Sequence, residues 1–187
     1  MTKEIMSAIS TQARAGLMGS GSMPRVISGV ASQVHYADEG LVAAEIGSSC
    51  VMIWNCAPDD FLFERQRSTL EKVISTHAEP IGFLCVVLAH APPPPEPMRK
   101  ASVEMLNDLK ARLACVAGVI EGQGFRSAIT RSVLSGMAFV LSGRDFRVKF
   151  ANSVEHAAAF MSQFVNIGSV ELFGRVVDSY RPLLPPQ

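Results

Sequence analysis

The fold is decided by two runs of apolar sequence, Ile81-Gly82-Phe83-Leu84-Cys85-Val86-Val87-Leu88 and Ala114-Cys115-Val116-Ala117-Gly118-Val119-Ile120. Neither run alternates between polar and apolar residues, and such continuity is typical of strands that are covered on both faces. Both runs therefore predict central strands of a parallel sheet. Each is preceded by a segment with helical periodicity, over residues 58–77 and 98–112.

The remaining sequence extends this alternation of strands and helices in both directions. Before the first run, a short hairpin around Asp38-Glu39-Gly40 and a strand over residues 50–54 are expected. After the second run, the pattern predicts a helix over 125–141, a half-buried edge strand over 146–150 and a helix capped by Ser153. The predicted fold class is α/β, with a mostly parallel or mixed sheet of roughly 4–5 strands and helices in βαβ order.

Three regions of the chain differ in composition. Residues 1–24 combine a weak helical periodicity with a Gly/Ser linker, so they are either a flexible tail or a docking helix. Residues 25–165 hold the α/β domain. Residues 166–187 are predicted to form a C-terminal amphipathic extension, with its apolar stripe on the segment 169–180.

Composition excludes several classes of function. The 187 residues carry 17 Lys plus Arg and 17 Asp plus Glu, so a net charge of zero provides no field to recruit nucleic acid. No apolar run reaches the ~20 residues of a membrane span, and the expected location is the cytoplasm. The four cysteines form no CxxC pair, so we expect free thiols, no metal site and no cofactor.

This order of strands and helices resembles the STAS (anti-sigma-factor-antagonist-like) family and its SpoIIAA-like members, including those of myxobacteria. The resemblance covers residues 32–165 and is clearest in the strand 115–120, the turn 121–126 and the later strand 146–150. It includes an S-x-E-x-A pattern at Ser153, Glu155 and Ala157. The resemblance implies a STAS-like signalling module that contacts a protein partner at the helix after the middle strand.

The chain departs from that family at the usual phosphorylation position. The matching loop, His90 to Pro97, contains no Ser or Thr, and Ser102 lies inside the predicted helix. The four consecutive prolines, Pro92 to Pro95, favour an extended conformation, which serves either as a recognition element or as a stiff connector. The residues predicted to bind a partner here are His90, Pro93, Pro94, Met98, Arg99 and Ser102.

Surplus apolar residues indicate a second candidate surface. The predicted helix 125–141 is apolar nearly all round, and the C-terminal stripe also needs a cover. Either the C-terminal helix packs on its own domain, or the apolar faces join two chains in a homodimer. The partner-binding candidates on these segments are Met137, Phe139, Phe173 and Tyr180.

Chemistry at the strand ends is a weaker alternative. The turn with Gly122, Gly124 and Arg126 either binds an anion at a helix N-terminus or simply uses glycine for backbone freedom. Cys56 and His90 are either a nucleophile and its base, or a buried thiol and a loop histidine. The sequence contains no paired catalytic motif and therefore predicts a non-catalytic protein-interaction or regulatory module. The alternative is a small-molecule sensor or small enzyme using the rim near His90 and Glu121.

Overall fold

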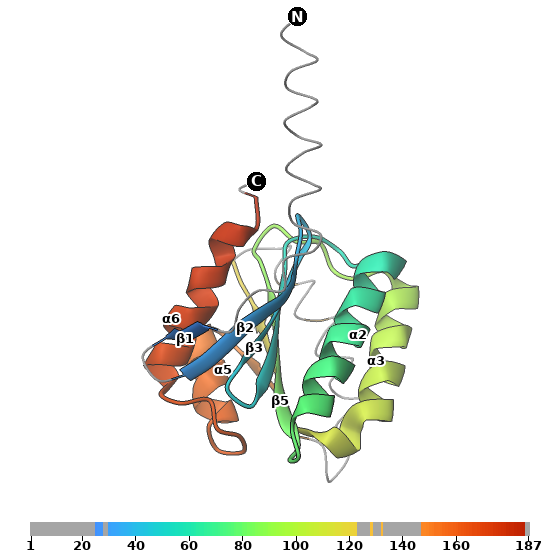
Figure 1. Cartoon of the computed structure of the whole chain (residues 1–187). Helices are drawn as coiled ribbons and strands as arrows, with labels where there is room; N and C mark the ends of the chain where they lie inside the picture. Colours follow the sequence, from blue (N-terminus) through green and yellow to red (C-terminus); the bar gives the residue numbers. More distant parts are fainter. Residues whose placement is uncertain (1–24, 28–29, 123–127, 129–131, 133–146, 186–187) are drawn as a thin grey trace, which may run out of the picture.

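The chain forms an α/β structure in which one mixed sheet is covered by helices on both faces (Figure 1). The computed structural model describes residues 25–27, 30–122, 128, 132 and 147–185. The predicted tail 1–24 and most of the predicted helix 125–141 lie outside these residues. The strands are β1 (Arg25–Ile27), β2 (Val30–Ala37), β3 (Leu41–Ile46), β4 (Ser49–Trp54), β5 (Ile81–Val87), β6 (Leu113–Ile120) and β7 (Val148–Ala151). The helices are α2 (Asp60–Thr76), α3 (Glu96–Leu109), α5 (Val154–Met161) and α6 (Val170–Tyr180), with short 3-10 turns at Lys110–Arg112 and Arg181–Leu183.

The described sheet has seven strands in the order of the sequence, so the expected 4–5 strands are too few. The excess lies at the N-terminal side, where β1, β2, β3 and β4 pair antiparallel with one another. Strands β4 to β7 then pair parallel, with helices α2 and α3 connecting the first three. The predicted edge strand is confirmed, since β7 borders the described sheet.

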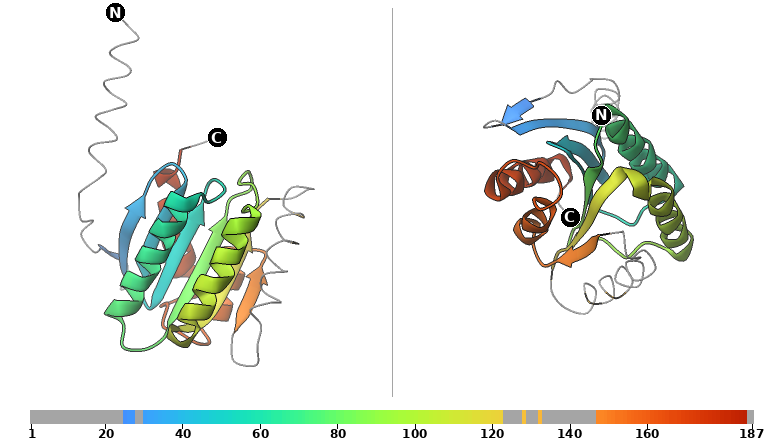
Figure 2. Two further views of the ribbon diagram at one scale, coloured as in Figure 1. Left: turned by 90° about the vertical axis from the view of Figure 1, so that its right-hand side faces the viewer. Right: turned by 90° about the horizontal axis from the view of Figure 1, so that it is seen from below.

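Helices lie on both faces of the sheet (Figure 2), and a hydrophobic core lies between the sheet and each helical layer. The α2/α3 core contains one set of strand side chains, such as Phe83, and the α5/α6 core contains the alternate set, such as Leu84. The two apolar runs therefore form strands covered on both faces, as their lack of alternation predicts.

Polar side chains fix the ends of the helices. Asp59 accepts a hydrogen bond from the N–H of Leu62 at the start of α2, and Ser153 and Ser169 begin α5 and α6 in the same way. At the other end of α2, the Arg112 guanidinium donates to the backbone oxygens of Ile74, His77 and Ala78. Asp59 therefore has a structural role, as a helix cap.

The C-terminal extension belongs to the main domain. Helix α6 lies beside α5 on one face of the sheet (Figure 1). Phe173 and Tyr180 of its apolar face are both buried in the core there. Of the two outcomes left open by the sequence, the helix packs on its own domain. These two residues are removed from the candidate partner surface, because a side chain within the monomer's core cannot contact a second protein.

Candidate functional site

The carboxyl ends of β4, β5 and β6 meet at one rim, as expected for parallel strands. The N–H of Leu88 donates to Trp54 O, and the N–H of Glu121 donates to Val87 O, so the three strands end side by side. Asn55, just after β4, accepts a hydrogen bond from His90 at 2.5 Å. The Asn55 amide also donates to Glu39 O at 2.9 Å, which links the rim to the hairpin turn.

This rim does not assemble the suggested nucleophile and base. His90 Nε2 is used by Asn55, while Cys56 Sγ lies 3.9 Å from the backbone oxygen of Gly40. Burial, helped by the nearby Asp38 carboxylate, raises the pKa of the Cys56 thiol. A thiol needs a lowered pKa to act as a nucleophile at neutral pH, so the arrangement favours a structural role for both residues.

The other rim candidates are also held in structural contacts. Glu121 accepts a hydrogen bond from Arg181 at 2.5 Å, and the same guanidinium binds Asp178 at the end of α6. Gly122 has φ of 81°, a conformation that glycine adopts without strain, which agrees with the turn interpretation. The other two anion-binding candidates, Gly124 and Arg126, lie outside the described residues, as do Met137 and Phe139.

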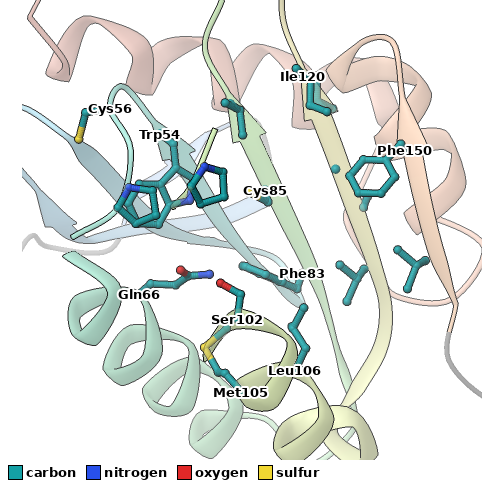
Figure 3. A pocket seen from close by; sticks show the side chains of 18 of the residues that line it. Trp54, Cys56, Gln66, Phe83, Cys85, Ser102, Met105, Leu106, Ile120 and Phe150 are labelled. Atoms are coloured by element: carbon teal, nitrogen blue, oxygen red, sulfur yellow. The ribbon is translucent and has the colours of Figure 1, made fainter. Parts of the chain in front are cut away.

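A cavity lies on the α2/α3 face, next to the rim. Its volume is about 100 Å³, the same order as the ~150 Å³ apolar cavities that bind benzene. Strands β4 to β7 form one wall, and α2, α3 and the proline loop form the other (Figure 3). Its largest lining side chains are Trp54, Phe83, Met105, Ile120 and Phe150.

Gly118, in the middle of β6, leaves room for the Phe150 ring, which lines this pocket. A Cβ atom at this position would come within 2.4 Å of the Phe150 ring, so the ring lies where a side chain of β6 would otherwise be. Both residues line the pocket, and Phe150 comes from the edge strand β7. The pocket wall therefore depends on a long-range pair that joins two neighbouring strands.

The polarity of the pocket is low. Its lining residues, counted over the part of the chain that the structure describes, include no Asp, Glu, Lys, Arg or His. Burial raises the pKa of the Cys85 thiol to about 12, despite an opposing hydrogen bond from Trp54, so this thiol is protonated and neutral at pH 7. Since a buried charge without a partner is costly, the pocket favours a neutral occupant.

Two polar side chains, Gln66 and Ser102, reach this apolar space. The Ser102 hydroxyl donates to Met98 O at 2.7 Å within α3, which leaves its oxygen able to accept. Gln66 is only 6% exposed, and its carboxamide forms no hydrogen bond with any residue that the structure describes. In Figure 3 both side chains are directed toward the same part of the pocket.

The proline loop contributes to the pocket directly. Pro92 and Pro94 line it, and Pro93, Met98 and Arg99 are partly exposed beside it. Arg99 donates to Pro94 O at 3.3 Å, which ties the loop to α3. Six of the residues predicted to bind a partner therefore lie on one segment at the edge of the pocket, from His90 to Ser102.

A separate polar cluster lies between β2, β3 and the end of α2. Glu45 contacts His35 Nε2 at 3.1 Å and His77 Nε2 at 3.0 Å. Gln33 of β2 pairs with Glu45 of β3, and His35, two residues further along β2, therefore lies on the same face as Glu45. The contact with His35, followed by the one with His77, lowers the pKa of Glu45 despite burial.

We predict that Glu45→Gln destabilises the fold by about 1–2 kcal/mol at pH 7. A carboxyl group with a lowered pKa stabilises the folded state above its unfolded pKa, near 4.5, and this contribution is lost as the pH falls through the folded pKa. Urea unfolding should therefore give a lower free energy of unfolding for the variant than for the wild type at pH 7. This difference in free energy should become smaller below about pH 4. Glu171→Gln, at an exposed position of α6, is the control and should have the same free energy of unfolding as the wild type at either pH.

Among the described residues, no cluster of His, Cys, Asp or Glu has the geometry to hold a metal ion. In the same part of the chain, no helix is both long and apolar enough to cross a membrane.

Sequence reasoning missed the pocket residues Trp54, Gln66 and Gly118 as site candidates. For Gln66 a signal existed, because it lies four residues from both Leu62 and Leu70 on the buried stripe of α2. A polar residue on an apolar stripe is a candidate for a role in a cavity. Gly118 gave no such signal, since its partner Phe150 is distant in the sequence.

Comparison with known proteins does not assign this chain to a family. No family model matches the chain, and no curated protein or solved structure shows significant similarity to it.

Proposed function

We propose that this chain is a non-catalytic, STAS-like regulatory module that binds a small, neutral, mostly apolar molecule in the pocket between the sheet and helices α2 and α3. The observation that carries the proposal is a pocket walled by Trp54, Phe83 and Phe150, without a charged side chain among its described lining residues. Pockets of this kind gain affinity from apolar burial and orientation from a few polar groups. The rim contacts of Cys56, His90 and Glu121 support binding rather than catalysis.

Protein recognition is the second proposed function, and it involves the segment from His90 to Ser102. This segment borders the pocket, so a bound molecule would contact Pro92 and Pro94 from inside while a partner contacts the outer face. A homodimer through the described surface has less support, because its exposed large hydrophobic side chains are Phe61 and Leu183 alone. A cytoplasmic location remains a prediction.

The pocket proposal is tested by thermal unfolding of the full chain with toluene and, as a charged compound of similar size, benzoate. At ten times its Kd, toluene should raise the Tm by roughly 3–6 °C, because a ligand that binds only the folded state stabilises it. Benzoate should give no shift, since its carboxylate would lose hydration without gaining a partner.

Two phenylalanine variants of α3 locate the binding. Ser102→Phe places a ring at the pocket and should abolish the toluene shift, whereas Asn107→Phe adds the same ring on the exposed side of the helix and should preserve it. Equal toluene-induced Tm shifts in the two variants, or no such Tm shift in the wild type, would contradict the proposed function.

A further inference from the structure

The carboxamide of Gln66 is the feature of this pocket that apolar packing does not explain. The side chain belongs to a residue that is 6% exposed, it lines the pocket, and it forms no hydrogen bond with the described residues. The carboxamide is not among the fully buried polar atoms that lack a partner, so it is open to the pocket, and an occupant that covers it without a hydrogen bond costs free energy. An apolar residue at this position would serve packing better.

The surroundings define what could satisfy this group. Gln66 offers two donors and an acceptor, and the Ser102 oxygen, whose proton is used by Met98 O, offers a further acceptor. The other described lining groups are aliphatic or aromatic side chains, prolines and the thiols of Cys56 and Cys85, the latter neutral at pH 7. A matching molecule therefore carries one neutral hydrogen-bonding group at this end and is apolar elsewhere.

We infer that Gln66 is the specificity-determining residue of the pocket, and that it selects small apolar molecules with a single hydroxyl, carbonyl or amide group over pure hydrocarbons. This inference rests on the proposed function and deepens it. Polar groups contribute selectivity because a ligand lacking the matching group leaves the buried amide unpaired, while a charged ligand gains no counterion.

Phenol and toluene test this inference, because they have almost the same shape and differ in a hydroxyl and a methyl group. Isothermal titration calorimetry gives both Kd values for the wild type and for Gln66→Met, which keeps an unbranched side chain. The substitution should raise the Kd of phenol relative to that of toluene by at least about 5-fold, since it removes the donors and the acceptor of the carboxamide and leaves the Ser102 oxygen as the remaining partner of the hydroxyl. The ratio cancels changes in pocket size or folding that affect both ligands equally.

Thr69→Val is the matched control, because Thr69 is another buried polar residue of α2 but does not line the pocket. This variant should leave the ratio of the two Kd values unchanged. An unchanged ratio in Gln66→Met, with toluene still bound, would overturn the role of Gln66 and leave the proposed function intact. Failure of both ligands to bind the wild type would overturn both proposals.

Discussion

Replacing Phe173 with alanine should lower the free energy of unfolding by about 3–5 kcal/mol, the usual cost of truncating a buried phenylalanine. The ring is fully buried where α6 packs beside α5 on the sheet. Its removal leaves a cavity that a sheet and two helices cannot easily close. Because proteins of this size are stable by roughly 5–15 kcal/mol, the loss is a large fraction of the total.

Urea unfolding followed by circular dichroism measures this effect. Arg175→Ala, at an exposed position of the same helix, is the control and should stay within about 0.5 kcal/mol of the wild type. If Phe173→Ala does not fold, Phe173→Leu keeps the measurement possible, with a cost of about 1–1.5 kcal/mol. An unchanged midpoint in both Phe173 variants would mean that the ring lies on a surface, which is the other of the two outcomes that the sequence left open.

Gly118→Ala should destabilise the fold by about 1–3 kcal/mol and weaken ligand binding, because the added methyl group meets the Phe150 ring. Two ring atoms lie 2.4 and 2.5 Å from the position of the new Cβ. Alanine in place of glycine ordinarily stabilises regular structure by roughly 0.5–1 kcal/mol through the unfolded chain. The sign of the change in the free energy of unfolding therefore shows whether the steric contact outweighs that gain.

A double-mutant cycle isolates this contact. Phe150→Leu removes the ring, so Gly118→Ala should cost much less in that background than in the wild type, and the two effects should not add. Gly174→Ala in α6 is the control of opposite sign, because its Cβ would come no closer than 3.6 Å to Glu155. It should stabilise the protein by about 0.5–1 kcal/mol. Additive changes in the free energy of unfolding for the Gly118 and Phe150 substitutions would contradict a steric contact between these two positions.

Much of the fold could be predicted from local patterns. The two apolar runs form β5 and β6, with both faces covered, and Ser153 begins the helix that it was expected to cap. The number of strands was underestimated, because β1 is an additional strand and both hairpin strands, β2 and β3, join the same sheet. Such N-terminal strands depend on pairing with a neighbour, and pairing is not a local property.

The candidate site was predicted less well. The residues from His90 to Ser102 do lie together, since they are consecutive and join a central strand to its helix. The rim candidates Cys56, His90 and Glu121 also lie at neighbouring strand ends, but each is held by a different group, namely Gly40, Asn55 and Arg181. Which side chain meets which depends on distances that no spacing in the sequence reveals.

The amino-acid order alone determined that this chain alternates strands and helices, buries two continuous apolar strands and carries no net charge. These properties follow from hydrophobic periodicity and capping, which act over a few residues. The tertiary structure alone decided that the stripe of α6 covers the sheet, that Phe150 fills the space over Gly118, and that Gln66 faces a cavity. Those features arise from packing between segments far apart in the chain, where a single atom of extra volume changes what can fit.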